Sequence, residues 1–373
     1  MKSIIKIIVI LLVIAGGVVF WMWNSNKEKD LEILKADLPI DTVEKADQWL
    51  QQLHDDKEFN GGVLLIKKGE VIFNKTYGYT DHTKSEKLTS QSSFRLASVS
   101  KQFTAVGIMI LKEQGKLDFD DPIATYLPEL TYKEATVRHL VNHTSGIPDA
   151  YMDFPKKYKN EIGDELQISE VVSLLAKENL PFEAQPNDRF QYSNTGYVLL
   201  AAIIEKVSNS SFEEFMRKEL FEPLGMKNTR VWNLVSADKT FKNKTGSFEY
   251  SLGSVKALPP SVYDGLSGDG GIFSSLDDFI IWHQFWIENS LLSKETMEEV
   301  FKKPILNNGQ PSSYGFGWTV FDNGGMFHNG SWLGARTFIA RNKVSKNCIV
   351  LLDNSKNEKT DFIGQQLAKV LRD

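Results

Sequence analysis

The sequence predicts an α/β fold in which strands from both ends of the chain form one antiparallel sheet, with a mostly helical region inserted between them. Residues 61–80 read GGVLLIKKGEVIFNKTYGYT, two apolar runs that meet at Lys68 and Gly69, which indicates a hairpin. Strand-like runs return at 314–321, 326–330, 335–342 and 347–353. From Ser98 to about Arg230 the apolar spacing is mostly helical, with breaks at glycine and proline.

Helices are predicted at both ends of this pattern, over 43–56 and over 361–373.

With 373 residues, 42% of them hydrophobic, the chain can bury one large core or two smaller ones. A net charge of -5 gives no reason to expect a nucleic-acid partner. The single cysteine, Cys348, excludes an intramolecular disulfide, and its apolar neighbours indicate a buried thiol on a strand.

The first 26 residues differ in kind from the rest. Two lysines precede an uncharged run from Ile7 to Trp23, and no small-residue cleavage pattern follows it. We therefore expect residues 1–26 to be an uncleaved N-terminal transmembrane helix, with a cleaved signal peptide as the alternative. Residues 27–40 read as a polar tether and 41–373 as one domain. Lys2 and Lys6 favour a cytoplasmic N-terminus and a domain outside the membrane.

A serine and a lysine three residues apart open the central helical region, at Ser98 and Lys101. On a helix the two side chains share a face, and the Ser98 N–H in the first turn is free to donate to an oxyanion. A lysine in a desolvated pocket can lose its proton and take one from a serine hydroxyl. Taken alone, this spacing more often belongs to a capping serine and a solvated lysine, so the motif needs support from the rest of the chain.

Tyr192, Ser193 and Asn194 open another helical run. A tyrosine facing Lys101 can pass a proton to a leaving group, and Asn194 can hold the lysine and a substrate amide. The alternative is an ordinary helix N-cap, for which Ser193 or Asn194 would suffice.

His328, Asn329 and Gly330 lie on a predicted strand before a turn. We expect Gly330 to let substrate backbone approach closely and the Ser331 N–H to be a second oxyanion donor. The alternative is a plain hairpin with an exposed histidine.

In order and approximate spacing, these three motifs resemble those of the serine β-lactamase-like hydrolases. That family includes class C β-lactamases, D-alanyl-D-alanine carboxypeptidases, D-amino-acid peptidases and esterases. Five linking segments are similar too: FRLASVSKQFTA, HLVNHTSGIPD, LFEPLGMKNTR, GDGGIFSSLDDF and YGFGW. The resemblance covers roughly residues 55 to 355 and implies a two-lobed β-lactamase-like fold, with the site at the junction of the sheet and the helical lobe.

The resemblance implies that Ser98 is the acylated nucleophile, Lys101 its general base and Tyr192 the end of the proton path. Asn194 would orient Lys101 and the substrate, and the N–H groups of Ser98 and Ser331 would hold the oxyanion. It implies no cofactor and no metal.

His328 stands where class C β-lactamases carry a lysine, which favours the carboxypeptidase, peptidase and esterase branches. We hypothesise that its imidazolium faces a substrate carboxylate.

Three patterns that would indicate other kinds of active site are incomplete in this sequence. GLSGD at Gly265 lacks the final glycine of the nucleophile elbow of α/β-hydrolases, because Asp269 stands there. His139 and His143 have the i, i+4 spacing of zinc ligands but no accompanying glutamate, so structural roles are favoured. GDGGIFSS lacks the lysine of a phosphate loop and indicates a tight turn.

The sequence thus predicts a membrane-anchored serine hydrolase, acting outside the cytoplasm on D-amino-acid-containing peptides of the cell envelope. Small esters or amides are the alternative substrates. A receptor that binds wall peptides or β-lactams without turnover is the alternative of a different class.

Overall fold

The structure, a computed structural model, describes residues 40–236, 238–251, 254–289 and 291–372. The predicted transmembrane segment 1–26, and all but the last residue of the tether 27–40, lie outside these residues. Within the described ranges, none of the helices has the length and apolar character needed to cross a bilayer. Residues 41–373 form one compact unit by their contacts.

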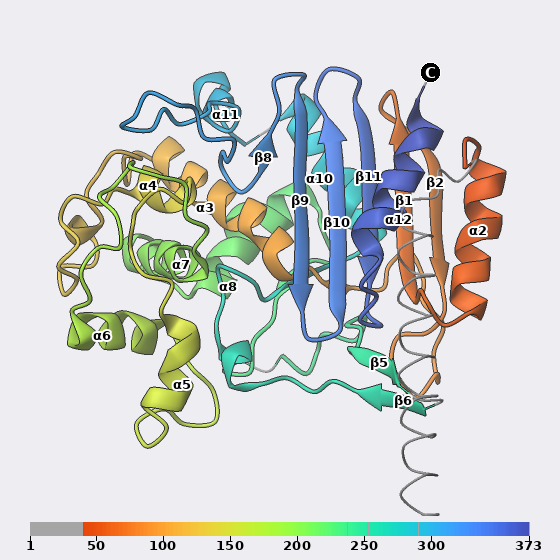
Figure 1. Cartoon of the computed structure of the whole chain (residues 1–373), viewed down its shortest axis with the longest axis horizontal. Coiled ribbons are helices and arrows are strands. Elements are labelled where there is room, and N and C mark those ends of the chain that lie inside the picture. The colour runs from red at the N-terminus through yellow and green to blue at the C-terminus, as the bar shows by residue number, and fades with distance from the viewer. Residues whose placement is uncertain (1–39, 237, 252–253, 290, 373) are drawn as a thin grey trace, which may run out of the picture. The chain divides into compact units, whose positions relative to one another are not determined.

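A six-stranded antiparallel sheet joins the two ends of the domain (Figure 1). Its order is β2 (Glu70–Tyr77), β1 (Gly61–Lys67), β11 (Asn347–Asp353), β10 (Ala335–Asn342), β9 (Gly325–Trp332) and β8 (Thr319–Val320). Early and late strands meet where β1 pairs with β11, with Leu64 opposite Val350. The predicted antiparallel sheet from both termini is therefore confirmed. Cys348 is a buried free thiol on β11, as predicted.

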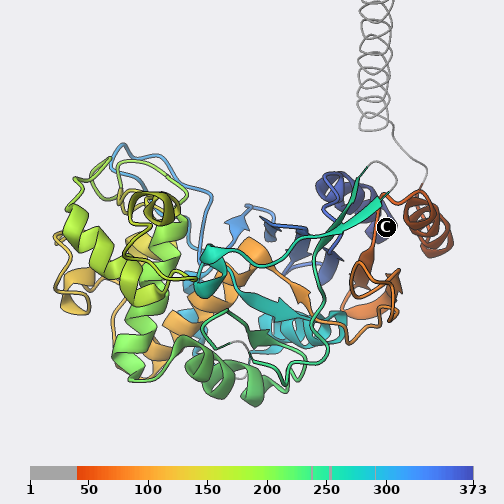
Figure 2. The ribbon, with the colours of Figure 1, turned by 90° about the horizontal axis from the view of Figure 1, so that it is seen from below.

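Helices cover both faces of this sheet. α12 (Thr360–Leu367) packs on β10 and β11, while α10 (Leu276–Glu288) packs behind β1 and β11 (Figures 1 and 2). Because both faces are covered, β1 is buried almost throughout, which explains its continuous apolar run. α2 (Val43–Asp55) lies against β2 at the edge of the sheet and begins at Thr42, whose side chain accepts from the Lys45 N–H.

The inserted region is helical, as predicted, and lies beside the sheet in Figure 1. Its helices are α3 (Lys101–Glu113), α4 (Val137–Val141), α5 (Phe154–Lys157), α6 (Ile168–Glu178), α7 (Asn194–Ser208), α8 (Phe212–Met216) and α9 (Glu222–Leu224). α11 (Lys294–Glu299) follows α10. A small sheet, in the order β3 (Phe94–Arg95), β7 (Ile272–Ser274) and β4 (Arg230–Val231), and a hairpin of β5 (Phe248–Ser251) and β6 (Ser254–Ala257) complete the strands.

The central helix α3 is buried on every side from Lys101 to Leu111. It packs on α7, and Phe103 stacks on Trp282 of α10 with ring centroids 4.1 Å apart. This apolar enclosure also takes in the first turn of α3, so it buries Lys101 along with the hydrophobic residues that follow.

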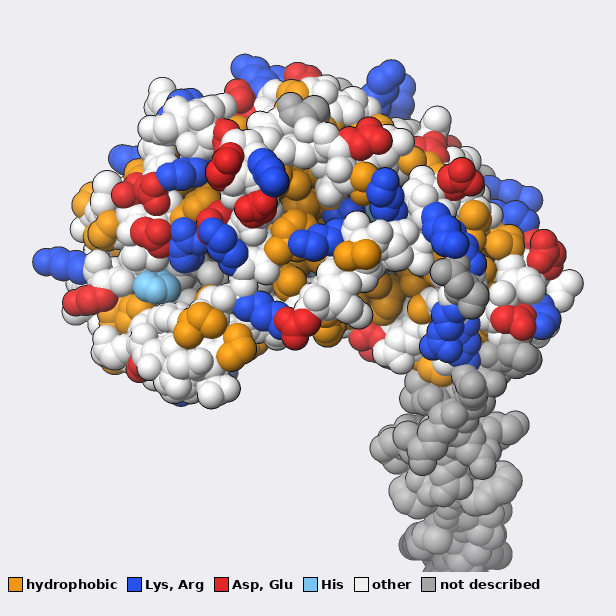
Figure 3. Space-filling view, turned by 90° about the horizontal axis from the view of Figure 1, so that it is seen from above, with side chains coloured by type: hydrophobic (Ala, Val, Ile, Leu, Met, Phe, Trp, Pro, Cys, Tyr) orange, Lys and Arg blue, Asp and Glu red, His pale blue; other side chains and the backbone are white. Residues whose placement is uncertain are grey.

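The surface carries charges of both signs without segregation. In Figure 3 lysine and arginine side chains alternate with aspartate and glutamate over the visible face. Such a mixed pattern gives no extended field of one sign over that face.

Candidate active site

Ser98 lies in a tight 3-10 turn, Ala97–Ser100, that runs into α3. We expected Ser98 in the first turn of an α-helix, and this detail was wrong, because the α-helix begins only at Lys101. Ala97 has a φ of 48°, a left-handed conformation that costs an alanine about 1 kcal/mol or more. The turn leaves Ser98 half-buried between buried neighbours.

The side chain of Ser100, the residue just before Lys101, points elsewhere. It is fully buried, and its Oγ accepts a hydrogen bond of 3.2 Å from the backbone N–H of Ile272 in β7. Ser98 is therefore the serine that combines access to solvent with contact to Lys101.

Lys101 is fully buried, and three oxygens surround its Nζ. Asn194 Oδ1 lies 2.9 Å away, the carbonyl oxygen of Asp269 2.8 Å away and Ser98 Oγ 3.4 Å away. The rings of Tyr192 and Tyr197 complete the enclosure, with centroids 5.0 and 5.6 Å from Nζ. Because two of the oxygens belong to an amide and a peptide group, they accept N–H bonds whatever the charge of the lysine.

Asn194 begins α7, and the start of that helix is held by a carboxylate that the sequence reasoning missed. Asp149 accepts from the Thr195 N–H at 2.7 Å and lies 3.4 Å from both Ser193 Oγ and Asn194 Nδ2. Ser193 is the N-cap, as the alternative interpretation of this motif supposed, and accepts from the Gly196 N–H. The Asn194 amide is thus oriented with Oδ1 toward Lys101 and Nδ2 toward Asp149.

Tyr192 packs against His143, with ring centroids 4.3 Å apart. The hydroxyl of Tyr192 has no hydrogen-bond partner among the described residues. His143 accepts from the Ser193 N–H through Nδ1, and burial holds its pKa well below the usual range. His139 caps α4 together with Thr136. The structural roles predicted for both histidines are confirmed.

His328 is buried rather than exposed to substrate charge. Its Nδ1 lies 2.6 Å from the Asn329 carbonyl oxygen, which can only accept, so Nδ1 carries a proton. Its Nε2 lies 2.8 Å from the Tyr314 hydroxyl, which donates to it. Burial and the charge of Lys101 lower the pKa of His328 to about 4. The hypothesis of an imidazolium that faces a carboxylate is therefore wrong, because the ring is neutral near pH 7.

Gly330 is required by the close packing of the protein around it. A Cβ at this position would lie 2.4 Å from Thr337 Oγ1, 2.5 Å from the Leu96 carbonyl oxygen and 3.0 Å from the Ser98 nitrogen. The glycine thus lets β9 approach the turn that carries Ser98. Gly330 also lines a pocket beside Ser98, and the approach of substrate backbone to it stays a prediction. The next residue, Ser331, is exposed at the end of the same strand.

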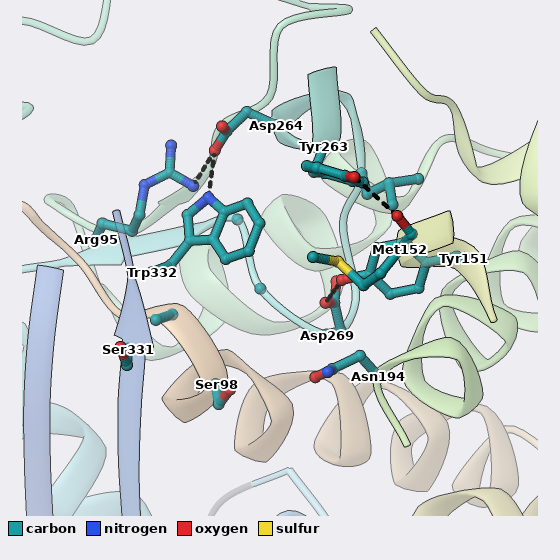
Figure 4. A pocket seen from close by; sticks show the side chains of 14 residues that line it. Arg95, Ser98, Tyr151, Met152, Asn194, Tyr263, Asp264, Asp269, Ser331 and Trp332 are labelled. Carbon is teal, nitrogen blue, oxygen red and sulfur yellow. Dashed lines mark hydrogen bonds and ion pairs between the residues drawn. The ribbon is translucent and has the colours of Figure 1, made fainter. Parts of the chain in front are cut away.

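Two pockets meet at Ser98 and Ser331. The first, the Trp332 pocket, has a volume of about 210 Å³, and Asn194, Asp269 and Trp332 contribute to its lining (Figure 4). Asp269 accepts from the Tyr151 hydroxyl at 2.7 Å, and burial raises the pKa of this carboxyl group.

In one wall of the Trp332 pocket a buried ion pair joins Arg95 to Asp264 at 2.7 Å. Asp264 also accepts from the Trp332 indole N–H at 3.0 Å, so the same carboxylate holds both the arginine and the tryptophan. Figure 4 shows the three side chains together on one wall.

The second pocket, the Asp361 pocket, has a volume of about 380 Å³ and opens on the side of α12. Its lining includes Ser98, Tyr192, His328, Ser331 and Asp361. The predicted residues are thus brought together around Ser98, with Asn194 on the first pocket and Tyr192 and His328 on the second.

The residues that sequence reasoning missed carried weak signals. Asp149, Tyr314 and Asp269 stand in the segments HTSGIPD, YGFGW and GDGG, to which the sequence patterns assigned no catalytic role. Asp269 contacts Lys101 through its backbone carbonyl, which any residue type provides, so no side-chain pattern could have identified it.

The comparison with protein families decides the identity of this fold and site. Residues 46–371 match the sequence model of the family described as Beta-lactamase. The chain belongs to the beta-lactamase family. Members of this family include penicillin-binding proteins and other serine hydrolases, and the chain is a serine hydrolase by this membership.

Individual relatives support the assignment. Penicillin-binding protein 4* of Bacillus subtilis is 35% identical over 353 residues, which cover 91% of this chain and 74% of that protein. The octameric penicillin-binding protein homologue from Pyrococcus abyssi superimposes with a TM-score of 0.72 at 27% identity, covering 88% of this chain and 77% of that one. The D-amino acid amidase from Ochrobactrum anthropi superimposes with a TM-score of 0.68 at 25% identity, covering 88% and 97%.

Proposed function

We propose that this beta-lactamase family member hydrolyses D-amino-acid-containing peptides or their amides through an acyl-enzyme on Ser98. The observation that carries the proposal is the surroundings of Lys101 Nζ. Two carbonyl-type oxygens, of Asn194 and Asp269, take two of its N–H groups, and the remaining direction faces Ser98 Oγ at 3.4 Å. An unprotonated lysine in this arrangement presents its lone pair to the serine hydroxyl.

The reaction follows from this geometry. Lys101 accepts the hydroxyl proton as Ser98 Oγ attacks the substrate carbonyl carbon, and the N–H groups of Ser98 and Ser331 hold the oxyanion. As the bond to the leaving group breaks, the proton passes from Lys101 by way of Tyr192 to the leaving atom. Water then attacks the ester on Ser98, gives up its proton along the same path, and frees the acid and the serine.

The relatives support the choice of substrate class. The most similar protein named above is a penicillin-binding protein, and one of the similar structures is a D-amino acid amidase. The name of the first gives penicillin as a ligand, and the name of the second gives amides of D-amino acids as substrates. In this protein itself, a neutral His328 and a half-buried Ser98 fit an uncharged amide or ester bond at the centre of the site.

Labelling and turnover together test the proposal. A fluorophosphonate should label the wild type and Ser100→Ala but not Ser98→Ala, because Ser98 Oγ lies 3.4 Å from Lys101 Nζ whereas Ser100 Oγ is buried against the Ile272 N–H. Turnover should then be measured over a panel of D-alanyl peptides, D-amino acid amides, simple esters and β-lactams. Hydrolysis of D-configured but not L-configured amides supports the proposal. Labelling without any turnover would assign the protein as a receptor instead.

We further propose that residues 1–26 anchor the domain to the membrane and that the domain lies outside the cytoplasm. The support is the uncharged run from Ile7 to Trp23 behind two lysines. The full-length protein should sediment with membranes and be open to protease added to the outside of cells. A mature N-terminus that begins after Trp23 would instead establish a cleaved signal peptide.

A further inference from the structure

The two pockets at Ser98 have different relations to the proton path. Tyr192 lines the Asp361 pocket, whereas Asn194 lines the Trp332 pocket. The leaving atom must receive its proton as the bond breaks, so it has to lie on the side of the proton donor. If Tyr192 delivers that proton, the leaving group enters the Asp361 pocket and the acyl group enters the Trp332 pocket.

The charged residues in the lining of the Asp361 pocket are one cation, Arg336, and two anions, Glu358 and Asp361. His328 adds no charge near pH 7, because its pKa is lowered to about 4. The lining is therefore net negative by one charge.

The single cation of the lining is already paired with an anion of the same pocket. Arg336 donates to the carbonyl oxygens of Leu333 and Ala335, both at 3.0 Å, and pairs with Glu358 at 2.6 Å. A carboxylate in the pocket would have to share this arginine with Glu358, whose negative charge lies in the same pocket.

Neutral hydrogen-bonding groups make up the rest of the polar lining. Asn329 donates to Asp361 at 2.8 Å. Asn357 is 8% exposed, and its Nδ2 is buried without a hydrogen-bond partner among the described residues. An unpartnered buried amide donor next to a pocket favours a ligand with a carbonyl or hydroxyl oxygen.

We propose that the Asp361 pocket is a leaving-group subsite that selects neutral or cationic leaving groups and disfavours those with a free carboxylate. This inference rests on the proposed function. The substrates it selects are esters, amides and internal peptide bonds of D-aminoacyl groups, while a bond to a carboxy-terminal amino acid is a poor substrate. The discrimination is electrostatic and comes from Glu358 and Asp361.

A set of thioesters with one acyl group tests the inference. N-acetyl-D-alanyl esters of 3-mercaptopropionate, 3-mercaptopropionamide and thiocholine differ only in the anionic, neutral or cationic leaving thiol. kcat/KM for thiol release, divided by the rate of hydroxide-catalysed hydrolysis of the same ester, corrects for intrinsic reactivity. We expect the anionic ester to be at least about fivefold poorer than the neutral one at low ionic strength, and the gap to narrow with added salt.

The double variant Glu358→Gln/Asp361→Asn should bring the ratio of anionic to neutral ester close to one. The control Glu44→Gln/Asp55→Asn removes two charges from α2, at the outer edge of the sheet beyond β2, and should leave the ratio as in wild type. Equal wild-type values for the two esters would overturn the inference. So would a low ratio that the Glu358/Asp361 variant does not change.

The same experiment separates this inference from the proposed function. If none of the three esters acylates the protein and the fluorophosphonate does not label Ser98, the proposed function fails. If the neutral ester is turned over but the charge of the leaving thiol makes no difference, only the assignment of the subsite fails.

Discussion

The hydroxyl of Tyr314 donates a hydrogen bond of 2.8 Å to Nε2 of His328, and the Asn329 carbonyl accepts from Nδ1 of the same ring at 2.6 Å. Both nitrogens of His328 are thereby engaged by the protein. Burial of the ring, with Lys101 nearby as a smaller cause, lowers the pKa of His328 and so keeps the imidazole neutral near pH 7.

His328 should make the protein less stable in acid rather than sense substrate charge. Its folded-state pKa of about 4 lies below the unfolded value of 6.5, so the unfolded chain binds the proton first. The stabilisation is complete above pH 6.5 and is lost as the pH falls toward 4, by up to about 3 kcal/mol. Unfolding by urea at pH 7 and pH 4.5 should show a smaller loss for His328→Gln than for wild type.

The difference between wild type and His328→Gln reports on His328 alone, because other buried histidines such as His143 and His283, whose pKa values are also lowered, are present in both proteins.

In wild type the KM for a carboxylate-bearing peptide should not fall as the pH is lowered from 8 to 6. A KM that falls in this range, and stops falling in His328→Gln, would restore the carboxylate-sensing role.

Gly330→Ala should disable the site by moving the turn that carries Ser98. The added Cβ has no room between Thr337 Oγ1 and the Leu96 carbonyl oxygen, so β9 and the turn must separate. We expect at least about a hundredfold loss in the rate of fluorophosphonate labelling, since displacements near 1 Å at reacting groups cost this much. Gly163→Ala, at an exposed site with nothing within 4 Å, is the control and should label normally.

Asn194 should act on Lys101 more than on substrate affinity. Asn194→Ala removes the 2.9 Å contact that orients Nζ, and kcat should fall about a hundredfold with a smaller change in KM. Asn194→Asp puts a negative charge beside the amine, which favours its protonated form. The acid limb of the kcat/KM profile should then move to higher pH, and an unmoved limb would argue against Lys101 as the base.

The Arg95–Asp264 pair should be costly to break. Both side chains are at least nine-tenths buried, so Asp264→Asn leaves a guanidinium without its counter-charge, at a cost of about 3–5 kcal/mol in the free energy of unfolding. Glu214→Gln breaks an exposed pair with Arg217 and should cost less than about 1 kcal/mol. Urea denaturation measures both variants, and similar losses would mean that burial of the first pair carries no extra cost.

Much of the fold was readable from local patterns. The hairpin at 61–80 and the late strands are apolar runs bounded by turn residues, and the central helices repeat apolar residues at helical spacing. The shared sheet of early and late strands was predicted because strands at both ends need one another to bury an apolar face, and the structure joins them at β1 and β11. The start of α3 was misplaced by three residues, because the left-handed φ of Ala97 is a backbone feature without a signature in the residue type.

The sequence by itself determined which side chains are available for chemistry: Ser98, Lys101, Tyr192 and Asn194 stand in motifs whose residue types fit proton transfer. The tertiary structure decided the roles of two further residues of the site, His328 and Gly330. Burial and two hydrogen bonds make His328 neutral, and close packing against Thr337 and Leu96 makes Gly330 necessary. Protonation and steric fit depend on the atoms within a few ångströms of a group, and here those atoms come from segments far apart in the chain.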